Sequence, residues 1–425
     1  MFFFYLSTRI DFFKFAIKVK LRKEDVKYNC RHFLGHIPCK PNKDYDVQCD
    51  NCSYYDKDDN SIEFLHSKEE KLNKIYELSN FSDTKFDISA DIIQTKKIKV
   101  LFIKLGAIGD VIRTTPLLER FEKEYKNCHF TWITHSPQVL PKDKVDLIYL
   151  WEKKYIDIIC NQNYDIVINL DKDKEACILL SLVNAKKKYG FVWKNGHINT
   201  ATDNADHKLI TGFFDHISKV NKKNYLEEIF EICHFDFKGE EYQINLNQNL
   251  SYKWNKKIKY VSKNKHIIAL NTGCGLRWKT RLWPSKYWIE LINLLHKNNF
   301  FCLLMGGPDE DEMNRYYQSK TDAMYLGVFD LEEFIAITQT TDIIVTPVSM
   351  MMHIAIALKK QLMLFHNIFN INEFELYDRG IIIEPRSGCD CYFGNSCSRE
   401  KSCMNDISVQ DVLSNIVLLN KKIKK

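Results

Sequence analysis

The stretch VLFIKLGAIGD, residues 100–110, decides the fold of this chain. It begins with an apolar run that is typical of a buried strand, and it ends in a glycine-containing turn with the carboxylate of Asp110. A helix is expected next, because apolar residues between Val111 and Phe121 fall on one face. A strand, a glycine-rich turn and a helix in that order are typical of doubly wound α/β folds, whose functional residues gather at the carboxyl ends of the strands.

Asp110 is the candidate catalytic residue of this turn. Backbone N–H groups at the start of a helix stabilise an ionised carboxylate, and such a carboxylate in a cleft can take a proton from an attacking hydroxyl. The alternative is a helix N-cap, a position that also favours aspartate. The turn lacks the G-x-G-x-x-G spacing of dinucleotide-binding proteins, and no acid follows the second strand at Thr134-His135. These features disfavour a hydride-transfer enzyme.

Strand-like and helix-like segments alternate along the rest of the chain. The strand-like runs lie at residues 99–104, 129–133, 146–150, 165–170, 266–270, 300–305, 342–346 and 361–365. This alternation predicts parallel sheets in two Rossmann-like domains that face one another. We expect an N-terminal extension over residues 1–97, an N-terminal domain over 98–250, a C-terminal domain over 251–425, and a linker in the polar stretch 240–262.

Composition and charge limit the class of protein. The chain has 425 residues and a net charge of +6, and its basic residues are interleaved with acids, which argues against a nucleic-acid binder. No apolar stretch approaches the roughly 20 residues of a membrane span, and the N-terminus lacks the features of a signal peptide. We therefore expect a cytoplasmic protein with reduced cysteines. Residues 1–25 are typical of an amphipathic helix, which would pack on this protein or a sister subunit, or lie on the inner membrane face.

The C-terminal half contains candidate nucleotide-binding segments. Thr272 and Gly273 follow the strand at 266–270, and Lys279 and Arg281 come shortly afterwards. A glycine loop with nearby cations can hold a diphosphate, and the alternative is a solvated basic loop.

Two further strands lead into candidate site residues. Gly306 follows the strand at 300–305, and Glu310 behind it suits either a ribose diol or the first turn of a helix. After the strand at 342–346, a helix that begins near Ser349 and Met350 would aim free backbone N–H groups at an anion. His353 lies one turn further on, where it would touch the phosphate or pack in the core. Asp171-Lys172-Asp173 is interpreted as a cleft rim in preference to a divalent-metal site.

Eight of the 14 cysteines form two clusters. Four densely spaced thiols in a reducing compartment are typical of a structural tetrahedral site, with zinc expected first and iron second. The alternative is free cysteines or a disulfide. The first cluster comprises Cys30, Cys39, Cys49 and Cys52, and the second, in the loop at 389–403, comprises Cys389, Cys391, Cys397 and Cys403.

Four segments, in their order along the chain, resemble glycosyltransferase family 9, the ADP-heptose heptosyltransferases. They are IKLGAIGDVIRTTP (103–116), RLWP (281–284), MGGP (305–308) and HIAIAL (353–358). The resemblance implies the GT-B fold with the active site between two domains, inversion of the anomeric configuration, and no catalytic metal. It also implies ADP-heptose as donor, bound by the C-terminal domain, and a glycolipid or a protein as acceptor, bound by the N-terminal domain.

The resemblance assigns roles to individual residues. Asp110 would be the catalytic base, and Arg281 would replace the family's phosphate-binding lysine, a sound exchange for a diphosphate. The nucleotide sugar would be held by Gly109, Thr272, Gly273, Lys279, Arg281, Gly306, Glu310, Ser349, Met350 and His353.

One position departs from the family pattern. The chain has Val348-Ser349 where the family has Asp-Thr, and valine cannot hydrogen-bond a sugar hydroxyl, so the donor sugar or its contacts can differ. The family has a branch that modifies bacterial autotransporter proteins, carries cysteine-ligated iron and oligomerises, and the cysteines here fit that branch. The rival hypothesis is a catalytically inactive GT-B-like binding protein whose cysteine-rich extension docks a partner.

Overall fold

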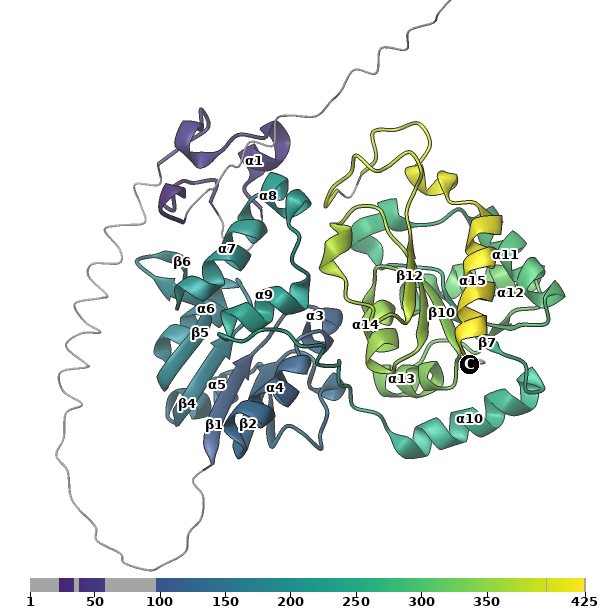
Figure 1. Cartoon of the computed structure of the whole chain (residues 1–425), viewed down its shortest axis with the longest axis horizontal. Coiled ribbons are helices and arrows are strands. Elements are labelled where there is room, and N and C mark those ends of the chain that lie inside the picture. The colour runs from purple at the N-terminus through teal and green to yellow at the C-terminus, as the bar shows by residue number, and fades with distance from the viewer. Residues whose placement is uncertain (1–22, 34–37, 58–96, 395, 424–425) are drawn as a thin grey trace, which may run out of the picture.

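The computed structural model describes residues 23–33, 38–57, 97–394 and 396–423. The helix expected at residues 1–25 lies outside this part, except for a 3-10 turn at Lys23–Asp25. Two α/β domains lie side by side, each built on its own sheet (Figure 1). None of the helices in the described residues combines the length and the apolar character that a membrane span requires.

The bounds of the elements are as follows. The N-terminal strands are β1 (Ile98–Ile103), β2 (Cys128–Thr134), β3 (Leu147–Leu150), β4 (Asn163–Asn169), β5 (Asn184–Lys194) and β6 (His197–Thr200). The C-terminal strands are β7 (Ile267–Asn271), β8 (Phe301–Met305), β9 (Met324–Tyr325), β10 (Ile343–Pro347), β11 (Gln361–Phe365) and β12 (Gly380–Ile383). The α-helices are α1 (Lys40–Tyr45), α3 (Ile108–Ile112), α4 (Pro116–Tyr125), α5 (Lys153–Cys160), α6 (Lys174–Leu182), α7 (Asp206–Phe213), α8 (Asp215–Val220), α9 (Tyr225–Ile232), α10 (Gln248–Ser262), α11 (Ser285–Lys297), α12 (Asp311–Lys320), α13 (Leu331–Gln339), α14 (Met350–Ala357) and α15 (Val409–Ile423).

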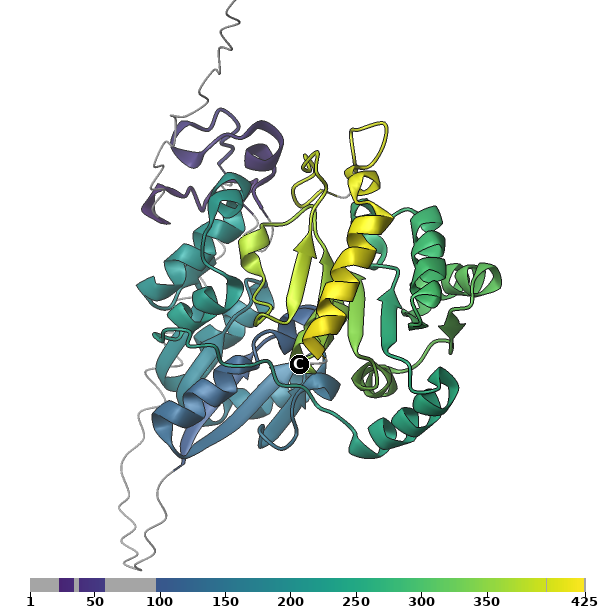
Figure 2. The same cartoon turned by 45° about the vertical axis from the view of Figure 1, so that its right-hand side comes forward.

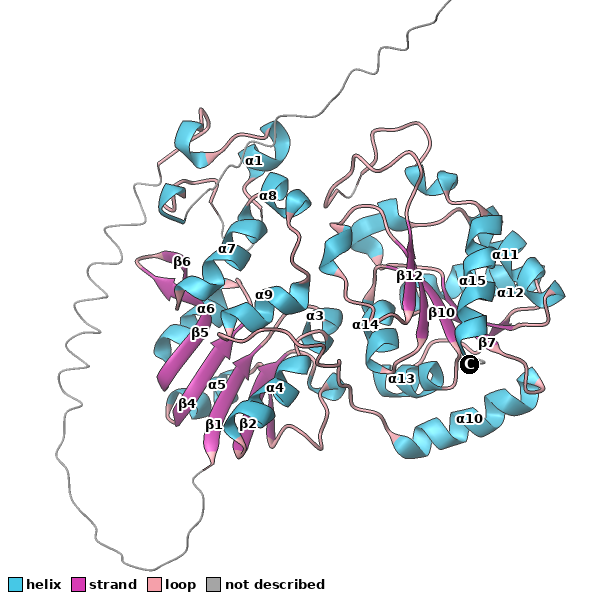
Figure 3. Cartoon of the chain, viewed as in Figure 1, coloured by secondary structure: helices cyan, strands magenta, loops and turns pink. Residues whose placement is uncertain are grey.

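Both sheets have the same strand order, and helices surround the strands of each sheet (Figure 3). The strand order is β3-β2-β1-β4-β5-β6 in the first sheet and β12-β11-β10-β7-β8-β9 in the second. Neighbouring strands are parallel except for the β5–β6 pair. Counted from the first strand of each sheet, this is the order of a doubly wound, nucleotide-binding sheet. The central strands β1 and β7 are apolar along most of their length because helices cover both faces of such a sheet.

All eight strands expected from the sequence are present, with ends shifted by at most two residues. The second half of the expected linker at 240–262 is helical, since α10 starts at Gln248, and this helix packs on α13. Trp254 and Ile258 of α10 are buried, which explains why this polar stretch forms a helix. The domain boundary expected after residue 250 therefore falls inside α10.

Two groups of contacts join the domains beside the connecting segment. In the first, the side-chain amide of Asn370 donates to the carbonyls of Ser218 (2.7 Å) and Asn221 (2.8 Å). In the second, the guanidinium of Arg379 forms two hydrogen bonds of 2.8 and 2.6 Å with the carboxylate of Glu241. These contacts add to the packing of α3 on α14, so the domains are attached to one another at several places.

The described segments of the N-terminal extension pack on the N-terminal domain near α7 and α8 (Figures 1 and 2). The backbone N–H of Cys39 donates to the carbonyl of Phe213 (3.2 Å), and the ring of Phe33 meets the ring of Phe213 edge-on at 4.7 Å. Lys43 donates to the carbonyl of Phe393 (2.9 Å), which lies in the C-terminal cysteine loop. The two cysteine-rich segments are therefore neighbours although they lie at opposite ends of the sequence.

Candidate active site between the two sheets

The site lies where the strand order of both sheets reverses. The reversal falls between β1 and β4 in one sheet and between β7 and β10 in the other, and ligands of doubly wound sheets bind beyond the strand ends at this point. The loops after β1 and β10 lead into α3 and α14, and these two helices pack against each other. The candidate binding edges of the two domains therefore face one another.

The glycine loop after β1 is held in place by Asp171, just beyond the end of β4. The Asp171 carboxylate pairs with the ammonium of Lys104 and accepts the backbone N–H groups of Leu105 and Gly106, the latter at 3.2 Å. Asp171 and Lys104 are both buried. Asp171 is therefore buried and not at a cleft rim, because its carboxylate holds the loop that carries Asp110, whereas Asp173 of the same segment lines a cavity.

Asp110 lies in the first turn of α3 with 34% of its side chain exposed. The cap position of α3 is Ala107, so the N-cap alternative is wrong. One carboxylate oxygen is 2.8 Å from the guanidinium of Arg113. Burial by itself would raise the pKa of Asp110, but Arg113 and then Lys104 lower it to about 2. The carboxylate is therefore ionised at neutral pH, as a general base requires.

Arg113 connects Asp110 to the opposite domain. A second nitrogen of its guanidinium is 2.7 Å from Glu373, in the 3-10 turn Ile371–Glu373, and the guanidinium lies 3.5 Å from the ring centre of Tyr225. Sequence reasoning gave neither Arg113 nor Glu373 a role. The i,i+3 spacing of Asp110 and Arg113 was an available signal. Glu373 lies 260 residues further along, so no local pattern could have indicated it.

The N-terminus of α14 is formed as the sequence predicts. Ser349 is the cap residue and Met350 the first helical residue. The Ser349 hydroxyl is 3.0 Å from the hydroxyl of Thr346 and 3.3 Å from the amide nitrogen of Asn271, which joins the loop after β7 to the start of α14. The first-turn N–H groups of a helix have no intrahelical partner and suit an anion.

His353 forms part of the contact between the domains. A Cβ atom at Gly109 would lie 2.4 Å from the ring carbon Cδ2 of His353, so only glycine allows α3 this approach. The ring lies parallel to that of Tyr242 with centres 6.1 Å apart. Burial, and then Arg113, lower the pKa of His353 to about 3, so the ring is neutral. Of the two interpretations of His353, packing is observed, and any contact with a phosphate would be made by a neutral ring.

Arg281 joins the two loops of the C-terminal domain. It is buried at 6% exposure, and its guanidinium donates to the carbonyl of Val348 and to that of Cys274 (2.9 Å). Its positive charge therefore lies between the loop after β7 and the start of α14. Lys279, in the 3-10 turn Leu276–Arg281, is exposed.

Glu310 lies against the glycines of both C-terminal loops. A Cβ atom at Gly273 would lie 2.0 Å from a carboxylate oxygen of Glu310, and one at Gly306 would lie 2.6 Å from its Cβ. The other carboxylate oxygen accepts the backbone N–H of Gly307 at 2.9 Å. Thr272 is buried nearby, and its hydroxyl is 2.9 Å from the side-chain oxygen of an asparagine of α12. Glu310 thus lies in the 3-10 turn that precedes α12, and it also faces the candidate nucleotide loop after β7.

The side chains of the cysteine clusters are not arranged around a common point in the described part of the chain. None of the 14 cysteines is in a disulfide, and no three cysteine, histidine or acidic side chains there are placed to hold a metal. Within each cluster the thiols are close enough to interact electrostatically, as Cys39 does with Cys49, and Cys389 with Cys403. Burial raises the pKa of Cys389 to about 12, so this thiol is protonated without a metal. The expectation of two metal sites is not confirmed.

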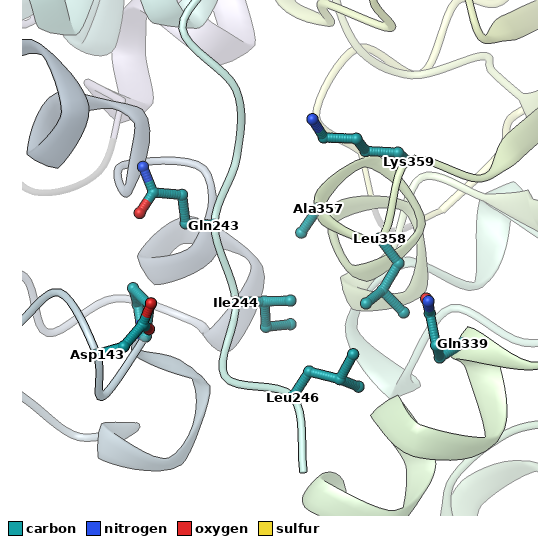
Figure 4. Close-up of a pocket in the computed structure, with 9 residues that line it drawn as sticks. Asp143, Gln243, Ile244, Leu246, Gln339, Ala357, Leu358 and Lys359 are labelled. Atoms are coloured by element: carbon teal, nitrogen blue, oxygen red, sulfur yellow. The ribbon is translucent and has the colours of Figure 1, made fainter. Parts of the chain in front are cut away.

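A cavity of about 330 Å³ lies at the opposite end of α14 (Figure 4). Gln243, Ile244 and Leu246 of the connecting segment line one side, and Ala357 and Leu358 from the end of α14 line the other. This cavity is separated from Ser349 by the length of the helix and is not part of the candidate site.

The family model "Glycosyltransferase family 9 (heptosyltransferase)" matches residues 153–368, about half of the chain. The chain belongs to glycosyltransferase family 9. A search of curated protein sequences finds no match. Membership of family 9 confirms the resemblance drawn from the sequence and establishes the chain as a glycosyltransferase.

Solved structures show the same fold. A family 9 glycosyltransferase from Veillonella parvula DSM 2008 is 17% identical with a TM-score of 0.59, and the match covers 76% of this chain and 97% of that one. The E. coli ADP-heptose LPS heptosyltransferase II is 14% identical with a TM-score of 0.59, covering 77% and 100%. E. coli heptosyltransferase WaaC with ADP-2-deoxy-2-fluoro heptose is 14% identical with a TM-score of 0.52, covering 76% and 99%. At these identities the likeness shows the fold, and the expected GT-B arrangement of family 9 is confirmed.

Proposed function

We propose that this protein is an inverting glycosyltransferase that transfers a heptose from ADP-heptose to an acceptor hydroxyl. The observation that carries this proposal is the position of Asp110. Its ionised carboxylate lies on α3, which packs against α14 of the opposite domain, and α14 presents a helix N-terminus beside the buried charge of Arg281. A base and an anion-binding helix end on facing edges are what displacement of a diphosphate requires.

The chemistry follows from this placement. Asp110 takes the proton of the acceptor hydroxyl, and the oxygen attacks the anomeric carbon from the face opposite the diphosphate. The bond from the anomeric carbon to the ADP oxygen breaks, and ADP leaves with the bonding electrons. Attack from the opposite face inverts the configuration. Lys279, Arg281 and the first-turn N–H groups of α14 would stabilise the charge that develops on the leaving group.

The glycines and Glu310 supply the remaining contacts. Gly273 and Gly306 leave room for the side chain of Glu310, which lies against both of them. Glu310 is placed to accept hydrogen bonds from a ribose diol. An inactive binding protein is less well supported, because it gives no reason for an ionised carboxylate and a helix N-terminus to lie on facing edges of the two domains.

Product analysis tests this function. Purified protein is incubated with ADP-heptose and either a lipid core glycolipid or an autotransporter protein that offers serine and threonine hydroxyls. We expect release of ADP and a mass increase of one heptose on one of the two acceptors, measured by mass spectrometry. Reactions without acceptor are the control. ADP-heptose left intact with both acceptors would contradict the proposal.

The pH dependence of the reaction should report the contact between Arg113 and Asp110. Replacing Arg113 with Met removes the largest influence that lowers the pKa of Asp110, while burial, which raises it, remains. The pKa should rise by about 1–3 units. The base must be deprotonated to act, so kcat/KM should fall when the pH drops below its pKa. For the wild type, kcat/KM should stay constant down to about pH 4. For Arg113→Met, the fall in kcat/KM should begin at a higher pH. Arg113→Lys keeps a charge and should resemble the wild type. An unchanged acid limb in Arg113→Met would exclude Asp110 as the titrating base.

Zinc or iron at the cysteine clusters remains a proposal, in a reducing, cytoplasmic setting. The donor set suits either metal, and binding would deprotonate the thiols. Metal analysis of protein purified without chelators should give one or two metal ions per chain, and Cys389→Ser should lose the ion of the second cluster. Protein that is free of metal yet fully active would contradict a structural metal.

A further inference from the structure

Three consecutive residues of the C-terminal cysteine loop, Tyr392, Phe393 and Gly394, form a tight turn that has no role in the mechanism above. The backbone N–H of Gly394 donates to the carbonyl of Cys391 (2.7 Å), and that of Phe393 donates to the carbonyl of Ile368 (3.0 Å). Phe393 has a φ of 45°, in the left-handed region, so the chain changes direction sharply at this residue. These bonds fix the 392–394 turn on the C-terminal domain.

One side of the 392–394 turn contacts the N-terminal domain at α8. The hydroxyl of Tyr392 donates to the hydroxyl of Ser218 at 2.8 Å, and the ammonium of Lys219 lies 5.1 Å from the centre of the Tyr392 ring. Both partners belong to α8, and the carbonyl of Ser218 also accepts the side-chain amide of Asn370. The turn is therefore part of the interface between the domains.

Lys43 of the N-terminal extension spans this interface. Its ammonium donates to the carbonyl of Phe393 at 2.9 Å and lies 3.6 Å from the carboxylate of Asp215, the first residue of α8. Lys43 belongs to α1, which lies beside α8 (Figure 1). Hydrogen bonds from a charged donor are stronger than those between neutral groups. One side chain of the extension thus joins a carboxylate of one domain to a backbone carbonyl of the other.

The other side of the turn contacts the candidate nucleotide loop after β7. The hydroxyl of Thr280 donates to the carbonyl of Gly394 at 3.0 Å. Thr280 lies between Lys279 and Arg281, the two cations proposed to stabilise the departing diphosphate. The carbonyl of Thr280 accepts the side-chain amide of Asn367 at 2.8 Å. The position of this part of the loop is therefore set jointly by Asn367 and by the turn.

Aromatic packing makes a second connection between the turn and Arg281. The ring of Phe393 meets the ring of Phe369 edge-on, with centres 5.1 Å apart. The guanidinium of Arg281 lies 5.4 Å from the centre of the same Phe369 ring, within the range of a cation–π contact. A shift of the turn would therefore disturb both the hydroxyl of Thr280 and the guanidinium of Arg281.

We propose that Lys43 is a positioning residue for the nucleotide sugar. It holds the 392–394 turn, and through the turn it holds the loop of Lys279 and Arg281 in the arrangement that binds a diphosphate. The inference rests on the proposed function, which places the diphosphate at this loop. Donor affinity then depends on the docked N-terminal extension. Because coupling between two binding equilibria is reciprocal, ADP in turn stabilises the docked extension.

Replacement of Lys43 in the full chain tests this role. Lys43→Met should weaken ADP binding by about fivefold, measured by calorimetric titration. KM for ADP-heptose should rise by the same factor and kcat should stay within about twofold, because the loop holds the diphosphate equally before and during the reaction. Lys43→Arg keeps a charged donor and should restore most of the affinity. Lys40→Met changes a lysine of the same helix whose side chain is 78% exposed, and it should have no effect.

A double-mutant cycle tests whether Lys43 acts through the turn. Thr280→Val breaks the connection at its other end and leaves the extension untouched, and we expect it to weaken ADP binding by about fivefold as well. The double variant should lose little more affinity than either single variant, since both changes interrupt the same connection. Losses that multiply in the double variant would overturn the inference.

Hydrogen exchange measures the reciprocal effect without any substitution. Saturating ADP should slow the exchange of backbone amides in α1 of the wild type by about fivefold, because ADP favours the docked extension. The same amides in Lys43→Met should not respond to ADP. Exchange in wild-type α1 that ADP leaves unchanged would overturn the inference.

The inference and the proposed function fail separately. Wild-type protein that transfers heptose, with Lys43→Met binding ADP as tightly as the wild type, would overturn the positioning role and leave the function in place. ADP binding that depends on Lys43, in a protein that transfers no heptose to either acceptor, would overturn the function and support the positioning role.

Discussion

Asp110→Asn is expected to lower kcat by about a thousandfold while the affinity for ADP stays close to that of the wild type. Asparagine has nearly the same size, but its amide cannot take the proton of the acceptor hydroxyl, and a positioned general base contributes about 10²–10⁴ to a rate. ADP binding should persist because the residues proposed to hold the diphosphate lie on the opposite domain. The measurements are initial rates of ADP release with acceptor present, and calorimetric titration with ADP.

The control for this variant is Asp322→Asn, a change in an aspartate whose side chain is 72% exposed. It should leave both kcat and ADP affinity unchanged. If Asp110→Asn instead lost activity, ADP binding and thermal stability together, the carboxylate would be a structural partner of Arg113. Retention of full activity would exclude Asp110 as the base.

Arg281→Met is expected to weaken ADP binding by about 10- to 100-fold and also to lower Tm. The guanidinium donates to two backbone carbonyls, and that of Val348 belongs to a buried residue, so its loss leaves acceptors without a donor. The same change removes the buried positive charge beside the start of α14, which should reduce stabilisation of the leaving diphosphate. Titration with ADP and thermal melts measure the two effects.

Arg281→Lys separates charge from geometry. Lysine retains the charge but cannot reproduce the fork that spans two carbonyls, so an intermediate loss of affinity is expected. Lys286→Met, a change in an exposed lysine of α11, is the matched control and should have neither effect. A lowered Tm with unchanged ADP affinity in Arg281→Met would make Arg281 a purely structural link between the loops.

The fold could be predicted from the sequence wherever one short segment contains the whole signal. The apolar runs of β1 and β7 and the glycine turns after them needed no distant residue to be interpreted. The β5–β6 hairpin was missed, although Asn195-Gly196 at its turn, both with positive φ, is a strong hairpin signal. The two-residue strand β9 carries too few residues for any period to show.

In the candidate site, too, the residues encoded within one short segment were predicted, and their distant partners were not. Asp110 and the start of α14 at Ser349 were predicted because each is encoded within its own turn. The partners of these residues come from tertiary contacts, as with Glu373 on Arg113 and His353 on Gly109. For Asp171, a charge after a strand was evident from the sequence. Its pairing with Lys104, which follows the neighbouring strand β1, was not evident.

The place of Arg113 at the domain interface has a consequence for any opening of the enzyme. Parting the two domains would break the contact of Arg113 with Glu373, which belongs to the C-terminal domain. It would not break the contact of Arg113 with Asp110, because the two residues lie three positions apart in the same turn of the N-terminal domain. The charge that keeps the base ionised therefore travels with it through each cycle of opening and closing.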